Sequence, residues 1–127
     1  MKKRVFKLKT FARWAKKLLS DEQLCVAAKE ILTGQYEADL GKGLCKKRIA
    51  VPGQGKSGAT RTLVAKESTV AIFYIAGRQK SDPSTDFNDA NIEQAQLLGQ
   101  ALQAATALKL NQLVADGVLQ EICHDCT

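Results

Sequence analysis

The spacing of hydrophobic positions changes near residue 10. Before that point, Phe6 and Leu8 alternate with Lys7 and Lys9, which is typical of a strand with one buried side. After it, apolar residues recur every three or four positions, which is the spacing of an amphipathic helix. Thr10 stands where the N-cap of that helix is expected. The pattern therefore predicts a short strand followed closely by a helix.

Two helices are predicted in succession before residue 35. The second begins at Ser20, which has the capping-box spacing to Gln23, and it ends at Gly34. Because so few residues join the two helices, we predict a helical hairpin. Its apolar stripes consist of Phe11, Trp14, Ala15, Leu18 and Leu19 in the first helix, and of Leu24, Ala27, Ala28 and Ile31 in the second.

Strands are predicted in the middle of the chain. Residues 44–51 and 60–67 mix apolar and polar positions at strand spacing, and a glycine-rich loop separates them. Residues 70–76 are continuously apolar, which predicts a strand that is buried on both sides at the centre of a sheet. The segment 118–122 is compatible with a last short strand.

A long helical pattern occupies most of the remaining chain, with a break near Thr106 and an end at Gly117. The order of elements predicts an α+β fold. In it, an antiparallel sheet of about four strands packs against the N-terminal helical hairpin and the C-terminal helices. The length of 127 residues fits a single domain, residues 1–127.

Charge is distributed unevenly along the chain. Residues 1–66 contain 16 Lys and Arg against 5 Asp and Glu, whereas residues 67–127 contain 3 against 8. Such a basic half favours a polyanionic partner, above all nucleic acid, over an ordinary solvated surface. No apolar run reaches the roughly 18 residues of a membrane span, and none follows the basic N-terminus. We therefore expect a cytoplasmic protein with no membrane contact.

Four cysteines bear on the redox state and on metal binding. In a cytoplasmic chain we expect Cys25, Cys45, Cys123 and Cys126 to be reduced. The C-terminal sequence C-H-D-C could offer two thiols and His124 to a metal ion, but a closed zinc site needs a fourth ligand that the sequence does not show. We therefore expect neither a metal nor a cofactor.

Residues 50–57 differ by one position from the nucleotide-binding motif G-x-x-x-x-G-K-[ST], because Ala50 takes the place of the first glycine. In that motif the loop leads into a helix whose N-terminal amides bind phosphate. Here a strand pattern follows, so we predict a loop between two antiparallel strands and no nucleotide site. Lys56 in this loop can still contact the phosphates of a nucleic acid.

Cationic side chains gather on and around these strands. Because side chains alternate along a strand, Lys46 and Arg48 share one face, about 7 Å apart, and Lys47 lies on the other face. Further cations are Arg61 at the start of the next strand and, after the central strand, Arg78 and Lys80. Such a cluster on an open sheet can bind a phosphodiester, although surface cations are more often simply solvated.

The residues that common nucleases use are absent from these strands. The only histidine is His124 near the C-terminus, and no Asp or Glu lies on the predicted strands before Glu67. A metal-dependent nuclease needs carboxylates to hold its ions, and a histidine-pair ribonuclease needs two histidines. A nuclease built on this sequence would therefore work with lysine and arginine.

Three segments of the chain resemble the RelE/ParE superfamily of bacterial toxins, in particular its RelE-like branch. They are FKLKTFARWAKKLLSDEQL, GLCKKRIAVPGQGKSGATRTLVA and QLVADGVLQEI, and the resemblance spans about residues 5–122. It implies four antiparallel strands with helices on one face, and a small helix-turn-helix antitoxin as partner. RelE-like members cut messenger RNA in the ribosomal decoding site, whereas ParE-like members poison DNA gyrase.

The resemblance also implies roles for individual residues. Lys46 would be the general base, Arg61 the phosphate clamp, and Arg48 and Arg78 further stabilisers of the phosphate charge. RelE proteins use a tyrosine after the central strand, and this chain has none there, so that Phe87 is the nearest aromatic residue. We expect contacts with RNA from Lys47, Lys56, Lys80 and Phe87.

Three functions stay open on the sequence alone. The first is an endoribonuclease toxin whose partners are an antitoxin, messenger RNA and the ribosome. The second is a gyrase poison on the same fold, and the third is a nucleic-acid-binding protein without catalytic activity. The basic triad of Lys46, Arg48 and Arg61 favours the first, whereas the missing tyrosine leaves room for the third.

Overall fold

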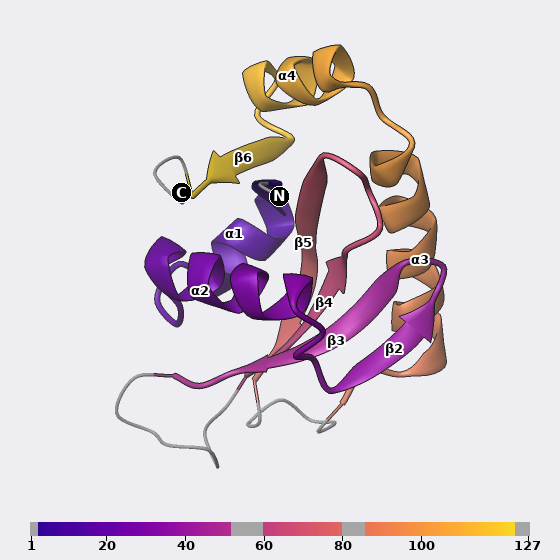
Figure 1. Ribbon diagram of the computed structural model, residues 1–127. Helices are drawn as coiled ribbons and strands as arrows, with labels where there is room; N and C mark the ends of the chain where they lie inside the picture. Colours follow the sequence, from indigo (N-terminus) through magenta and orange to yellow (C-terminus); the bar gives the residue numbers. More distant parts are fainter. Residues whose placement is uncertain (1–2, 52–59, 80–85, 124–127) are drawn as a thin grey trace.

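The computed structural model describes residues 3–51, 60–79 and 86–123, which contain four helices and six strands (Figure 1). Most of these elements match the predicted ones, and the strand at residues 38–41 is the one that was not predicted. In chain order the elements are β1 (Arg4–Leu8), α1 (Lys9–Ala15), α2 (Asp21–Leu32), β2 (Ala38–Gly41), β3 (Leu44–Ile49), β4 (Thr60–Ala65), β5 (Ala71–Arg78), α3 (Asp89–Gln103), α4 (Ala107–Ala115) and β6 (Leu119–Ile122).

All six strands belong to one sheet, in the order β2-β3-β4-β5-β1-β6. Neighbouring strands are antiparallel except for β1 and β5, which run parallel. The expectation of about four antiparallel strands was therefore too low, because β2 is a four-residue strand whose sequence has no marked period. The apolar run of β5 lies inside the sheet, between β4 and β1, as predicted.

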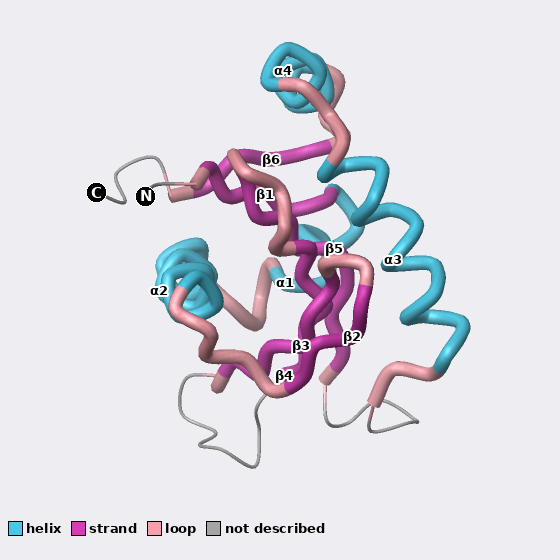
Figure 2. The backbone as a smooth tube through the Cα atoms, turned by 45° about the vertical axis from the view of Figure 1, so that its right-hand side comes forward, coloured by secondary structure: helices cyan, strands magenta, loops and turns pink. Residues whose placement is uncertain are grey.

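Helices cover both faces of this sheet, which corrects the one-sided arrangement that the resemblance implied (Figure 2). On the first face, here called the α1–α2 face, Phe11 and Leu24 share a core cluster with Tyr74 of β5. On the opposite face, the α3 face, Ala95 and Leu102 share a second cluster with strand residues. The sheet is thus the middle layer between two separate apolar cores.

Strand β1 is not half-buried, although its sequence alternates. Val5, Phe6 and Lys7 are all buried, because both faces of the sheet are covered. The ammonium of Lys7 lies 2.7 Å from Oδ1 of Asp21 at the start of α2. A buried ammonium requires such a partner, so this lysine is accommodated by an ion pair and not by solvent.

The helix boundaries are partly those predicted. Thr10 is not the cap of α1, because the chain passes directly from β1 into the helix and its N-cap, Leu8, makes no side-chain hydrogen bond. The capping box of α2 is present: the Gln23 N–H donates to Oγ of Ser20 at 3.2 Å, and the Ser20 N–H donates to Oε1 of Gln23 at 2.9 Å. Gly34 follows α2 with φ of 86°, a conformation that glycine adopts easily.

Helices α1 and α2 are consecutive on the α1–α2 face, but they do not form the predicted helical hairpin, because α1 packs mainly on β5 and α2 on β3. Gly77 of β5 permits close approach of α1, because a Cβ atom at this position would overlap the ring of Trp14. The buried hydroxyl of Tyr74 donates to the carbonyl oxygen of Leu24 at 2.6 Å. Strand β5 therefore contributes to the placement of both helices.

The C-terminal helical pattern is divided as predicted. After α3, the side chain of Thr106 accepts a hydrogen bond from the N–H of Lys109 at 3.1 Å and caps α4. The chain then returns to the sheet as β6, which pairs with β1 (Figure 2). Among the described residues, no helix combines the length and the apolar composition needed to cross a membrane.

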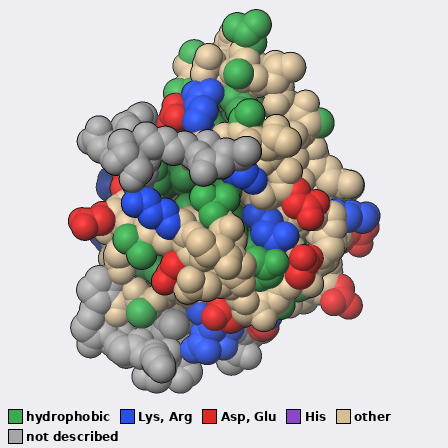
Figure 3. Space-filling model, viewed as in Figure 1, with side chains coloured by type: hydrophobic (Ala, Val, Ile, Leu, Met, Phe, Trp, Pro, Cys, Tyr) green, Lys and Arg blue, Asp and Glu red, His purple; other side chains and the backbone are tan. Residues whose placement is uncertain are grey.

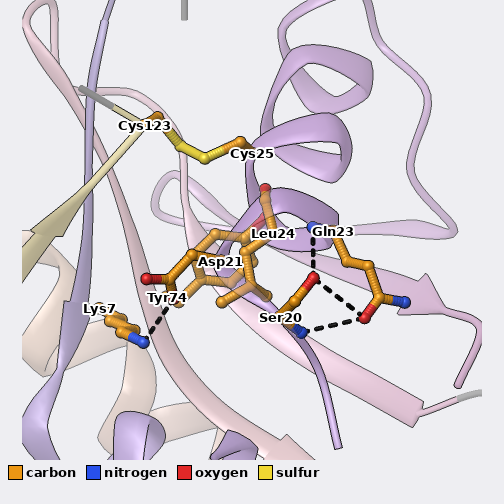
Figure 4. Close-up of a disulfide and its surroundings, with 8 residues drawn as sticks. All are labelled: Lys7, Ser20, Asp21, Gln23, Leu24, Cys25, Tyr74 and Cys123. Carbon is orange, nitrogen blue, oxygen red and sulfur yellow. Dashed lines mark hydrogen bonds and ion pairs between the residues drawn. A yellow bond between two sulfur atoms is a disulfide. The ribbon is translucent and has the colours of Figure 1, made fainter. Parts of the chain in front are cut away.

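A disulfide between Cys25 and Cys123 corrects the expectation that all cysteines are reduced (Figure 4). The two residues are 98 positions apart in the chain, and their Cα atoms are 5.6 Å apart. The fold brings them together because α2 and the end of β6 meet on the α1–α2 face. Cys45 is a free, buried thiol, and burial raises its pKa to about 12. Cys126 lies outside the described residues.

Candidate active site

The loop after β3 joins two antiparallel strands, as predicted. β3 and β4 pair in register from Leu44 opposite Ala65 to Ile49 opposite Thr60. A strand and not a helix therefore follows the loop, so the helix N-terminus of a nucleotide-binding loop is missing at this point. Residues 52–59, which include Lys56, lie outside the described residues.

Three arginines lie side by side across three neighbouring strands. Arg48 of β3 is directly opposite Arg61 of β4, and Arg61 is directly opposite Arg78 of β5. Directly opposite residues of antiparallel strands have Cα atoms about 4.5–5.5 Å apart and project from the same face. We call these three residues the arginine row. The sequence placed its members in one region but could not show that they are in register.

The arginine row belongs to the α3 face of the sheet. Along β4, Arg61 alternates with Thr60 and Thr62 and shares its face with Leu63, which lies in the core cluster beneath α3. Arg48 is exposed, whereas Arg61 and Arg78 are half-buried. The arginine row therefore lies between the apolar core of this face and the solvent. Arg48 is at the end of β3, where it also borders a cleft of about 340 Å³ beside α2, on the α1–α2 side of the sheet.

Lys46 lies on the same face, two residues before Arg48. It is directly opposite Leu63, and its side chain is 22% exposed. Its ammonium donates to Oδ2 of Asp86 at 2.6 Å. The structure thus brings together Lys46 and the arginine row, which are the four cations expected to form the site, and adds one carboxylate to them.

Asp86 enters the site from the segment that precedes α3. Its Oδ1 accepts a hydrogen bond from the backbone N–H of Phe87 at 2.8 Å, and Asn88 caps the helix that follows. Partial burial raises the pKa of Asp86, but the hydrogen bonds from Lys46 and Phe87 and the charges of Lys46 and Arg61 outweigh this effect and lower it. The carboxylate is therefore ionised at neutral pH.

Sequence reasoning missed Asp86 because it is 40 positions from Lys46 in the chain, in a polar segment with no period. The one available signal was that this carboxylate stands just before the N-cap of a predicted helix. A helix start is held in place by its packing, so a residue next to it can be directed at a neighbouring strand. Phe87 is half-buried and packs against the core beneath α3.

The remaining expected RNA contacts do not join this cluster in the described residues. Lys47 projects from the α1–α2 face, as alternation predicted, and its side chain is only 9% exposed. Its ammonium donates to the carbonyl oxygen of Gln35 at 2.8 Å and forms an ion pair with Glu30 at 3.0 Å. Lys80 lies outside the described residues.

Figure 3 shows the charged side chains on one face of the molecule. On the face seen in Figure 3, Lys and Arg alternate with Asp and Glu, and a group of Lys and Arg lies at the lower edge. The ends of β3 and β4 that adjoin residues 52–59 lie at the same edge in Figure 1.

Within the described residues, no group of three or more His, Cys, Asp or Glu side chains could hold a metal ion. His124 and Cys126 are outside that range.

Comparison with known families gives one match. A family model described as the RelE toxin of the RelE / RelB toxin-antitoxin system matches residues 3–122. The match includes all ten described helices and strands and both sides of the site. A comparison with curated proteins found no match.

Proposed function

This chain belongs to the RelE toxin family, and we propose that it is a metal-independent endoribonuclease that cleaves messenger RNA in the ribosomal decoding site. The observation that carries the proposal is the arginine row. Its three residues are directly opposite one another on neighbouring strands and share one face, so their guanidinium groups can offer paired donors to the oxygens of a single phosphodiester. RelE toxins are generally endoribonucleases of this kind, which supports the assignment.

The chemistry that such a site supports is attack of a ribose 2′-hydroxyl on the adjacent phosphorus, with departure of the 5′-oxygen. Negative charge grows on the phosphate oxygens as the new bond forms. Preorganised donors stabilise that charge, by roughly 10²- to 10³-fold in rate for each donor. Arg61 is the central member of the row, so it has a cation on each side and is best placed to clamp the phosphate.

Residues around the row would hold the rest of the RNA strand. We expect Lys56 and Lys80, on the chain segments that adjoin the row, to contact neighbouring phosphates, because such contacts position a nucleic acid without reading its sequence. Phe87 would stack on a base, since unstacked RNA bases pair well with aromatic rings. Lys47 projects from the α1–α2 face, away from the arginine row, so we do not propose it for this set.

The RelE family implies an antitoxin as partner. We propose that this antitoxin is a small helix-turn-helix protein, and that toxin and antitoxin meet in the cytoplasm. The basic half of the chain supports binding to a polyanion, which would be messenger RNA on the ribosome. Binding should therefore weaken as the salt concentration rises.

The decisive experiment is induced expression in the absence of the antitoxin, with mapping of messenger 5′ ends. We expect new 5′ ends inside reading frames within minutes of induction, and none from a variant in which Arg48, Arg61 and Arg78 are all replaced by Ala. Gyrase-linked DNA breaks without messenger cleavage would contradict the proposal. So would messenger cleavage by the triple variant at the rate of the original protein.

A further inference from the structure

The ion pair between Lys46 and Asp86 changes what each side chain can do. An ammonium that donates to a carboxylate at 2.6 Å has no lone pair with which to accept a proton. The role of general base, which the resemblance implied for Lys46, therefore requires a proton to be removed from it first. Asp86 is already in the form that accepts protons, and it lies in the same cluster.

The surroundings of Asp86 fit contact with a substrate. Its side chain is 43% exposed, so an RNA ribose can reach it. Its two oxygens are oriented, one by the Lys46 ammonium and the other by the Phe87 N–H. A carboxylate has about four acceptor sites, so it can bind several donors at once, and a 2′-hydroxyl would be one of them. The charge of Arg61 also acts on this carboxylate.

We propose that Asp86 is the general base of this site and that Lys46 is its general acid. The inference rests on the proposed function. The Asp86 carboxylate accepts the proton of the 2′-hydroxyl while the 2′-oxygen forms a bond to phosphorus. The bond from phosphorus to the 5′-oxygen breaks, and the Lys46 ammonium gives a proton to that oxygen. The proton on Asp86 then returns to Lys46 across their hydrogen bond, which restores the ion pair.

This assignment also accounts for the missing tyrosine. The segment after β5 contains no tyrosine, and in this assignment the reaction needs none, because Lys46 of β3 protonates the leaving group. A lysine ammonium is a stronger acid than the alcohol formed from the 5′-oxygen, so it can supply the proton. The products are a 2′,3′-cyclic phosphate and a 5′-hydroxyl, and no metal ion or added reactant is needed.

The test is single-turnover cleavage of messenger RNA on purified ribosomes, with four proteins compared at saturating concentration. They are the original chain, Asp86→Asn, Asp86→Glu and, as the matched control, Asp89→Asn. Asparagine keeps a carbonyl oxygen that can accept from Lys46 but cannot take up a proton. We expect Asp86→Asn to lower the cleavage rate by roughly 10²- to 10⁴-fold. Asp86→Glu should recover part of the lost cleavage rate. Asp89→Asn changes an exposed carboxylate at the start of α3 and should leave the rate unchanged.

The pH dependence of the original protein provides a test without any substitution. Because the pKa of Asp86 is lowered, its carboxylate is ionised throughout the range from about pH 5 to 8, and the cleavage rate should be flat there. A lysine base would instead make the rate rise about tenfold for each pH unit.

Each outcome decides the inference. A rate that rises tenfold per pH unit, or an Asp86→Asn protein that cleaves as fast as the original, overturns it. A faster Asp86→Asn protein would show that the carboxylate blocks the phosphate site, which also overturns it. If the original protein cleaves no messenger RNA at all, the proposed function fails, and the inference fails with it. Should Asp86→Asn not fold, Asp86→Glu and the pH profile decide.

Discussion

Lys46 and Lys47 are neighbours in the chain but belong to different parts of the molecule. Lys46 lies on the α3 face, beside the arginine row and Asp86. Lys47 lies on the α1–α2 face, where its ammonium is bound by Glu30 and by the carbonyl oxygen of Gln35. The two ammonium groups make similar contacts, since each donates to a carboxylate. Their surroundings are what differ.

The difference shows how one strand can serve stability on one face and chemistry on the other. On the α1–α2 face, the carboxylate of Glu30 balances the charge of Lys47, and the carbonyl oxygen of Gln35 accepts a hydrogen bond from its ammonium. Lys46 shares its face with the three arginines of the row and with the carboxylate of Asp86. Like charges directly opposite one another on neighbouring strands are unfavourable to folding, and a phosphate bound among them would relieve this repulsion. Substitutions on the α3 face should therefore change activity, and those on the α1–α2 face should change stability.

The largest effect is expected on the α3 face, for Arg61→Ala. Loss of the central clamp should lower messenger cleavage by roughly 10²- to 10³-fold. Arg61→Lys should recover little of it, because an ammonium cannot reproduce the planar fork of a guanidinium. The free energy of unfolding should hardly change, because removal of one of several like charges also relieves repulsion. Growth arrest and mapped 5′ ends after induction measure the first effect, and a thermal melt measures the second.

Arg13→Ala is the matched control, since Arg13 is an exposed arginine of α1 on the other face. It removes the same charge and should leave cleavage unchanged. A folded Arg61→Ala protein that is as toxic as the original would remove Arg61 from the site. A large loss of stability in Arg61→Ala would contradict the expectation that substitutions on the α3 face change activity and those on the α1–α2 face change stability.

The second-largest effect, on the free energy of unfolding, is expected for loss of the disulfide on the α1–α2 face. Cys25→Ser should lower the free energy of unfolding by about 2–4 kcal/mol, because the bridge closes a loop of 98 residues in the unfolded chain. Cleavage by the folded protein should not change. Urea unfolding with and without a reducing agent checks this: the reducing agent should destabilise the original protein and leave Cys25→Ser unaffected. Equal stability of the two oxidised proteins would contradict the prediction.

A smaller effect should separate the two lysines directly. Lys47→Met keeps most of the packing but leaves the Gln35 carbonyl and Glu30 without their donor, and it should lower the free energy of unfolding by about 1–2 kcal/mol. Lys46→Met should change stability less and cleavage much more. Both proteins can be compared by urea unfolding and by single-turnover cleavage. The comparison fails if Lys47→Met loses activity in proportion to Lys46→Met while it stays folded.

The smallest effect is expected for Tyr74→Phe. It removes the buried hydroxyl that donates to the carbonyl oxygen of Leu24, and with it about 1 kcal/mol of the free energy of unfolding. Burial raises the pKa of Tyr74, so the hydroxyl stays protonated and stability should show no dependence on it at ordinary pH. Thermal melts at pH 7 and pH 9 should give the same difference between the two proteins. Loss of cleavage in this variant would mean that the α1–α2 face also serves the reaction.

Elements with a strong period were predicted well, and the pairing between them was not. The capping box at Ser20, the apolar run of β5 and the break at Thr106 are local signals, and the structure confirms each of them. The four-residue strand β2 was missed because so short a segment has no period to recognise. The parallel pairing of β1 with β5 joins segments more than 60 residues apart, and local pattern carries no information about it.

The sequence by itself determined the basic character of the protein and the loop between β3 and β4, and it indicated the four cations of the proposed site, because charge, glycine content and side-chain alternation are properties of short segments. Only the tertiary structure decided that Arg48, Arg61 and Arg78 are in register, that Asp86 meets Lys46, and that Cys25 meets Cys123. The physical reason is the same in each case. These contacts depend on how strands pair and how helices pack on both faces of the sheet, and burial of the whole apolar core selects that arrangement.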